Sequence, residues 1–150
     1  VYERQQKANE LRTLLEKELA KAHIEAKFTW DIGATENEMQ EALLLIRQAQ
    51  WRWDFGVSSH GGSFHAPQET MRILGHGLNK VFQARMLISK VLVAHGYTDN
   101  VPLPDITTKE KAQQYIGLDM AVEKADKDKF LKEIVPEWLQ KAKANGRIVN

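Results

Sequence analysis

The residues best suited to chemistry are two histidines in a stretch rich in glycine and serine. It reads Ser59-His60-Gly61-Gly62-Ser63-Phe64-His65-Ala66-Pro67. Imidazole is the commonest metal ligand among neutral side chains, and glycine backbone allows the close approach of a bulky cofactor. His65 also precedes a helix expected to begin at Pro67, and the positive end of a helix dipole disfavours imidazolium. A neutral ring keeps a lone pair for a metal, so His65 is a candidate metal or haem ligand.

The same stretch also admits a plainer interpretation. In that interpretation His60 and His65 are loop histidines that hydrogen-bond to the backbone or to water. Ser58 and Ser59 lie beside His60, but adjacency in the sequence is not the geometry of a catalytic triad. The residues alone therefore leave ligation and a structural role open.

A second group of interest is Trp51-Arg52-Trp53-Asp54-Phe55. It is suited to be a cofactor wall with an arginine for a haem propionate. It is equally suited to be a helix end anchored in the core by tryptophan and an Arg–Asp pair. The other histidines are expected in packing, at an interface or at the surface: His76, His23 and His95.

Composition narrows the chemistry. The chain has 150 residues, no cysteine and a formal charge of +1. Without cysteine it forms no disulfide, thiolate zinc site or iron–sulfur centre, and attaches no haem through Cys-x-x-Cys-His. The near-neutral charge does not favour binding to nucleic acid. Phosphate-loop, dinucleotide-binding and His-Glu-x-x-His motifs are absent from the sequence.

The elements that must position these residues are all predicted to be helical. Apolar residues recur at spacings of three and four, and no segment alternates with a period of two. The predicted fold class is all-α, a bundle of long amphipathic helices that forms a single domain over residues 1–150. We expect helices over residues 1–28, 35–54, 67–94, 107–117 and 119–145, with an irregular stretch over 55–66.

Capping and breaking residues set these boundaries. Thr35-x-x-Glu38 and Thr107-x-x-Glu110 read as capping boxes. Pro67 suits the first turn of the third helix, and Pro136 should kink or split the last one. Gly75 and Gly77 within the long third helix indicate that something packs closely against its backbone.

Several motifs together resemble the C-terminal part of the pentahaem cytochrome c nitrite reductases. They are Ala49-Gln50-Trp51-Arg52-Trp53-Asp54-Phe55, Ser59-His60-Gly61 with His65-Ala66-Pro67, Pro104 to Gln113, and Val135-Pro136-Glu137-Trp138. They follow one another in a consistent order over most of the chain. The chain is therefore expected to be a C-terminal fragment of a larger multihaem enzyme.

The resemblance implies a function for the whole enzyme. Such enzymes are periplasmic homodimers that reduce nitrite to ammonia with five c-type haems, and they bind calcium. The resemblance implies that His65 is the distal axial ligand of a bis-histidine electron-transfer haem attached by upstream sequence. It places no catalytic residue and no calcium ligand in this chain. It also implies dimerisation through the long C-terminal helices and a membrane-anchored multihaem quinol dehydrogenase as electron donor. The alternative hypothesis is a helical dimerisation module without a cofactor.

Overall fold

The structure is a computed structural model that describes residues 2–59 and 61–148. Within these residues the regular elements are helices and no strand occurs, so the all-α prediction is confirmed. The chain divides into two compact units, Val1–Leu103 and Pro104–Asn150. This division does not test whether residues 1–150 fold together, so the single domain stays a prediction.

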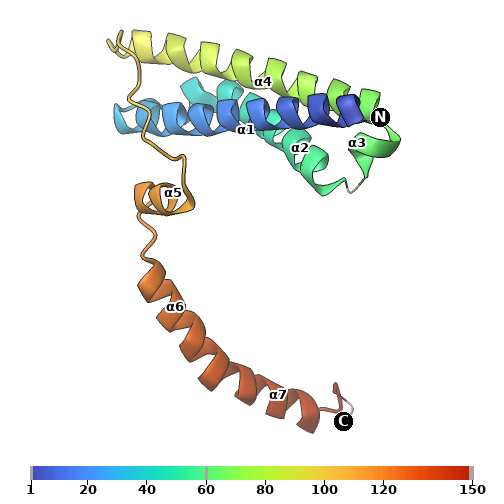
Figure 1. Cartoon of the computed structure of the whole chain (residues 1–150). Coiled ribbons are helices and arrows are strands. Elements are labelled where there is room, and N and C mark those ends of the chain that lie inside the picture. Colours follow the sequence, from blue (N-terminus) through green and yellow to red (C-terminus); the bar gives the residue numbers. More distant parts are fainter. Residues whose placement is uncertain (1, 60, 149–150) are drawn as a thin grey trace. The chain divides into compact units, whose positions relative to one another are not determined.

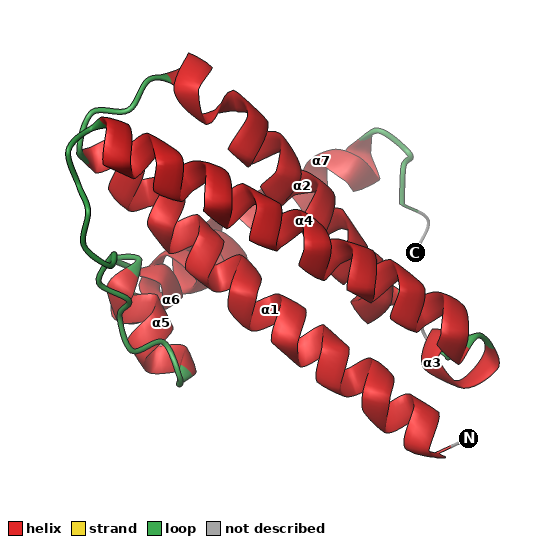
Figure 2. Ribbon diagram, turned by 90° about the horizontal axis from the view of Figure 1, so that it is seen from above, coloured by secondary structure: helices red, strands yellow, loops and turns green. Residues whose placement is uncertain are grey.

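Three long helices pack against one another in the first unit. They are α1 (Tyr2–Asp31), α2 (Glu36–Ser58) and α4 (Pro67–Ala94). Figures 1 and 2 show them side by side, with the short α3 (Gly62–His65) at the end where α2 passes into α4. The apolar stripes of the three helices meet in one core, whose largest fully buried aliphatic side chains are Leu15, Met39, Leu74, Val81 and Ile88.

Glycine allows the helices to approach closely at two points. A Cβ atom on Gly77 of α4 would lie 2.6 Å from Cδ2 of Leu15 in α1 and 3.3 Å from Cβ of Arg52 in α2. A Cβ atom on Gly56 of α2 would lie 2.8 Å from Cδ2 of Leu74 in α4. The expected close approach at Gly77 is therefore made by helices of the same chain. Gly75 has no heavy atom within 4 Å of its Cβ position.

A buried ion-pair cluster joins α1 to α4. Arg85 donates to both carboxylate oxygens of Glu25, at 2.8 Å and 2.6 Å, and also to Glu18. The side chain of Glu18 is only 8% exposed, and Lys21 contacts its other oxygen at 2.7 Å. A buried carboxylate is tolerated only with such partners, so this cluster fixes how α1 aligns with α4.

The beginning of α2 confirms the first predicted capping box. The backbone N–H of Thr35 donates to Oε2 of Glu38 at 2.8 Å, and the N–H of Glu38 donates to Oγ1 of Thr35 at 3.4 Å. The remaining oxygen of Glu38 lies 3.2 Å from Nε2 of His95, just beyond the end of α4. The backbone and side-chain hydrogen bonds of Thr35, followed by His95, lower the pKa of Glu38 to about 2.

Two boundaries in the first unit differ from the predicted ones. The first helix continues to Asp31, and the second continues to Ser58 where an irregular stretch was expected from residue 55. Gly56 remains helical because its bare backbone packs against Leu74. The third helix spans Pro67–Ala94 as predicted, and Gly96 follows it with a φ of 80°.

The second unit consists of α5 (Lys109–Tyr115), α6 (Met120–Lys129), a π-helical turn η1 (Phe130–Ile134) and α7 (Val135–Ala144). The predicted cap of its first helix is wrong by one residue. Thr108 is the N-cap, because the N–H and hydroxyl of Thr107 both donate to Asp105. The predicted break of the last helix at Pro136 is confirmed in part: α6 ends at Lys129, and α7 begins at Val135 with Pro136 in its first turn. The wider π turn before it accommodates the missing N–H and the crowding ring of proline.

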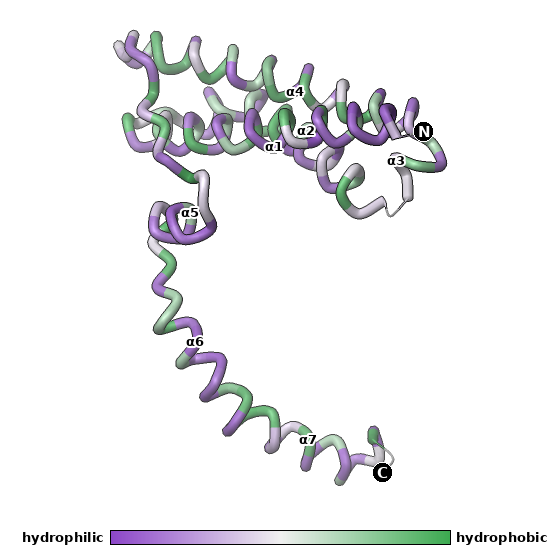
Figure 3. Tube along the Cα trace, viewed as in Figure 1, coloured by the Kyte–Doolittle hydropathy of each residue, from purple (hydrophilic) through white to green (hydrophobic). Residues whose placement is uncertain are grey.

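The second unit has no buried core among its described residues. None of the described residues 104–148 is buried. Figure 3 shows apolar and polar residues alternating along α6 and α7. Phe130 and Trp138 stack edge to face with centroids 5.4 Å apart, yet they remain 41% and 58% exposed. No helix within the described residues has the length and apolar character needed to cross a membrane.

The two glycines of α4 provide a matched test of the packing. Alanine favours a helix over glycine by about 1 kcal/mol, so Gly75→Ala should stabilise the protein. Gly77→Ala gains the same propensity but forces a methyl group against Leu15 and Arg52. We expect it to be about 1–3 kcal/mol less stable than Gly75→Ala in urea unfolding. Equal stabilities of the two variants would contradict the close approach at Gly77.

The hydrogen bonds of Glu38 predict a specific dependence of stability on pH. Because the folded state lowers its pKa from 4.5 to about 2, the ionised carboxylate adds stability above pH 4.5. That contribution is lost as the pH falls towards 2. The difference in unfolding free energy between the native protein and Glu38→Gln should therefore shrink over this range. Glu36→Gln, in the same first turn, controls for loss of charge alone. A Glu38→Gln difference that stays constant down to pH 2.5 would contradict the argument.

Candidate functional site

The segment that carries His65 is a short helical turn between two long helices. Gly61 adopts a φ of 81°, which glycine accepts without strain, and α3 follows at once. The N–H of His65 donates to the carbonyl of Gly61 at 2.8 Å, and the N–H of Ala66 donates to Gly62 at 2.9 Å. The carbonyl of Ala66 in turn accepts from the backbone and hydroxyl of Thr70 in α4. The turn is thus tied to the first turn of α4, and the prediction that His65 lies in a loop is corrected.

The His65 side chain is exposed and held from two sides. Its ring makes an edge-to-face contact with Phe64, with centroids 5.0 Å apart. On another side, a Cβ atom on Gly61 would lie 3.2 Å from Cδ2 and 3.6 Å from Nε2 of the ring. Among the described residues, none hydrogen-bonds to either ring nitrogen of His65. The turn therefore presents an accessible imidazole on an ordered backbone.

The other histidines occupy different surroundings. His95 bonds to Glu38, and His23 is exposed on α1, which agrees with their predicted surface positions. His76 is exposed rather than packed, and its Nδ1 lies 3.5 Å from Nη1 of Arg72. His60 lies outside the described residues. The described part of the chain contains no group of three or more His, Cys, Asp or Glu side chains arranged to hold a metal ion.

The aromatic end of α2 has features both of a cofactor wall and of a helix end anchored in the core. Trp53 packs against the core, whereas Trp51 is 76% exposed and Phe55 is 51% exposed. The expected Arg–Asp pair does not form. Arg52 donates to the carbonyl of Gln48 at 2.6 Å, and Asp54 accepts from Gln50 at 3.0 Å.

One buried polar atom at this end of α2 lacks a partner. The indole Nε1 of Trp53 is buried and has no acceptor among the described residues. Buried donors are normally satisfied. An acceptor from outside the described residues, or a water molecule, would supply the missing hydrogen-bond partner of this N–H.

Two adjoining hollows lie where α2 faces α4. One of about 280 Å³ is lined by Trp51, Arg52, Phe55, Arg72, Ile73 and His76. The other, of about 390 Å³, shares Arg52 and His76 and adds Gly75, Asn79 and Lys80. Sequence reasoning named Arg52 and His76 separately but did not bring them together. No sequence signal joined them, because the two walls of the groove come from different helices.

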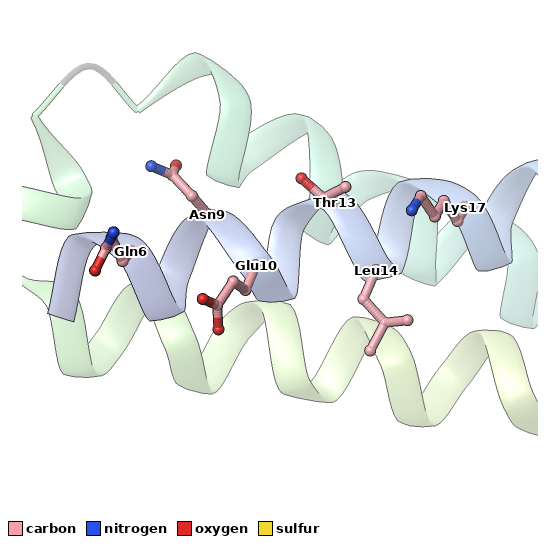
Figure 4. Close-up of a pocket in the computed structure, with 6 residues that line it drawn as sticks. All are labelled: Gln6, Asn9, Glu10, Thr13, Leu14 and Lys17. Carbon is pink, nitrogen blue, oxygen red and sulfur yellow. The ribbon is translucent and has the colours of Figure 1, made fainter. Parts of the chain in front are cut away.

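A further hollow of about 460 Å³ runs along the first half of α1. Figure 4 shows its lining residues: Gln6, Asn9, Glu10, Thr13, Leu14 and Lys17. All of them belong to one helix, and the set includes neither a histidine nor a cluster of like charges. It is an open flank of α1 with no convergent chemistry.

The comparison with protein families establishes the class of this chain. The cytochrome c552 family model matches residues 1–146, so the chain belongs to the cytochrome c552 family. This membership supports haem, iron and electron transfer as the chemistry of the family.

Curated relatives agree with this family. The chain is 74% identical over 148 residues to "Cytochrome c-552" of Bacteroides fragilis and 72% identical to that of Bacteroides thetaiotaomicron. It is 63% identical over 149 residues to "Cytochrome c-552" of Porphyromonas gingivalis. Each match covers 99% of this chain and 30% of the relative. The chain therefore spans less than a third of the length of these relatives.

These matches correct the family and activity expected from the sequence. The family and the relatives bear the name cytochrome c-552 and not that of a nitrite reductase. The assignment to an ammonia-forming nitrite reductase, with nitrite as substrate, is therefore withdrawn. That activity rested on the resemblance alone, because the chain was expected to hold no catalytic residue. The alternative of a module without a cofactor is withdrawn as well, because the matched family is one of cytochromes.

Proposed function

We propose that this chain is the helical part of a longer, multihaem c-type cytochrome, in which His65 is an axial ligand of an electron-transfer haem. The observation that carries the proposal is the exposed imidazole of His65, which has no hydrogen-bond partner among the described residues. Such a ring is free to offer a nitrogen lone pair to iron. The haem itself supplies the one-electron chemistry.

The surroundings of His65 fit an axial ligand. Ligation is stronger when the ring already has a fixed position, because an imidazole that rotates freely loses entropy on binding. The hydrogen bonds of α3 to Gly61 and Gly62 fix the backbone, and Phe64 restrains one side of the ring. Phe64 is itself 53% exposed and would provide apolar contact next to the iron site.

The covalent attachment of this haem must come from elsewhere. Attachment through thioether bonds needs cysteine, and the sequence has none. The relatives are about three times as long as the part that this chain matches. The remainder of the full-length protein would therefore carry the haem, while this chain contributes a ligand. Calcium, which only the resemblance described above implies, would likewise be bound by that remainder.

Three further expectations from the sequence stay proposals. The protein functions in the periplasm, forms a homodimer through its long C-terminal helices, and receives electrons from a membrane-anchored multihaem quinol dehydrogenase. The exposed apolar side chains of α6 and α7 support the second of these, because surfaces of this kind are commonly covered in an assembly.

Substitution of His65 tests the central proposal. In the full-length protein, His65→Ala should remove one strong-field ligand, so that one haem changes from six-coordinate low spin to five-coordinate high spin. Electron paramagnetic resonance and optical spectra read this change directly, and added imidazole should reverse it. His23→Ala, which removes an exposed histidine of α1, is the matched control. Spectra of His65→Ala that retain every low-spin haem would show that His65 is not a ligand.

A further inference from the structure

The hollows between α2 and α4 hold two cations without a counter-charge. Arg52 and Lys80 both line the larger hollow, and no aspartate or glutamate lines either one. Among the described residues, no carboxylate pairs with Arg52 or Lys80. One guanidinium N–H of Arg52 donates to the carbonyl of Gln48, and its other N–H groups remain available to a ligand.

A third cation at this groove is already neutralised. Arg72 donates to both oxygens of Glu69 at 2.7 Å and 2.5 Å. Arg72 and Arg52 line the same groove, but only Arg72 has a carboxylate partner among the described residues. Arg52 is also half-buried against α4, where an unpaired cation loses hydration without an ionic partner. An anionic ligand at Arg52 and Lys80 would restore that balance.

The α2 wall of the groove, which carries Arg52, is aromatic. Trp51 and Phe55 line the smaller hollow, and both expose more than half of their surface. Exposed aromatic rings beside two cations suit a ligand that has a flat apolar body and two carboxylates. A haem edge, with two propionates on one side of the macrocycle, has this form. An acidic protein surface would offer carboxylates but no flat body for Trp51.

We propose that Arg52 and Lys80 bind the propionate carboxylates of a haem carried by the remainder of the full-length protein. This inference rests on the proposed function, since it requires a haem-bearing partner segment. It adds a second contact of this chain with haem, distinct from His65. Arg52 and Lys80 would position the group and set its electrostatics without bonding to the iron.

The reduction potential of the haem provides the test. Positive charge near a haem favours the ferrous form, so removing it should lower the potential. In the full-length protein, Arg52→Gln and Lys80→Gln should each shift the potential of one haem downward, and the double variant should shift it further. All three should retain their low-spin spectra, because no iron ligand changes. The protonation of a propionate should also move to higher pH, which spectroelectrochemical titration detects.

The chain offers two matched controls. Glu69→Gln combined with Arg72→Gln removes a neutral ion pair at the same groove, and Lys90→Gln removes an exposed lysine of α4 that lines neither hollow. Both should leave the potentials unchanged. Arg52→Lys should keep most of the native potential because it retains the charge.

Two results would overturn the inference. The first is a double variant that is folded, low spin and unchanged in every haem potential. The second is an unchanged potential combined with a salt-dependent loss of reduction by an electron donor, which would show that the groove docks an acidic protein. If Arg52→Gln does not fold, the haem potentials of Lys80→Gln still test the inference. The two proposals fail in different ways. The His65 variant is read by the spin state of a haem, whereas the Arg52 and Lys80 variants are read by the reduction potential at an unchanged spin state.

Discussion

The first unit depends on the close approach of three helices at Gly77. A side chain there would collide with Leu15 of α1 and press on Arg52 of α2. This contact sets the spacing of both helices from α4, and the second close approach, of Gly56 to Leu74, sets where α2 ends. Because α2 and α4 are joined by only a few residues, their spacing determines where α3 lies. The position of His65 is therefore a consequence of backbone packing several turns away.

Charge and capping complete this frame. The partly buried cluster of Arg85 with Glu18 and Glu25 aligns α1 along α4. Breaking it would leave Glu18 with Lys21 alone and would remove the ionic partner of Glu25. At the other end, Glu38 holds the first turn of α2 and also contacts His95 beyond α4. The second unit has no comparable core, since none of its described residues is buried. The ordered platform for the candidate site is thus the first unit.

Much of this arrangement could be predicted from the sequence, and the exceptions have physical causes. The span Pro67–Ala94 was predictable because proline and glycine mark its two ends. The extension of α2 to Ser58 was not, because the stability of Gly56 in a helix comes from Leu74, a partner distant in the sequence. The cap at Thr108 was missed because Asp105 takes the hydrogen bonds of Thr107. The groove of Arg52 and Lys80 needed the structure, since its two walls come from different helices. The sequence could name His65, but the family had to come from comparison.

The central claim is that His65 of this chain is a ligand of a haem attached elsewhere in the full-length protein. The short α3 turn, ring nitrogens that no described residue hydrogen-bonds, and the absence of cysteine from the sequence all bear on that one bond. The most direct measurement is an experimental structure of the oxidised, haem-loaded full-length protein. We expect a nitrogen of His65 bonded to a haem iron whose other axial ligand comes from outside this chain. A structure in which every haem iron has both axial ligands from other residues, with His65 in solvent, would contradict it.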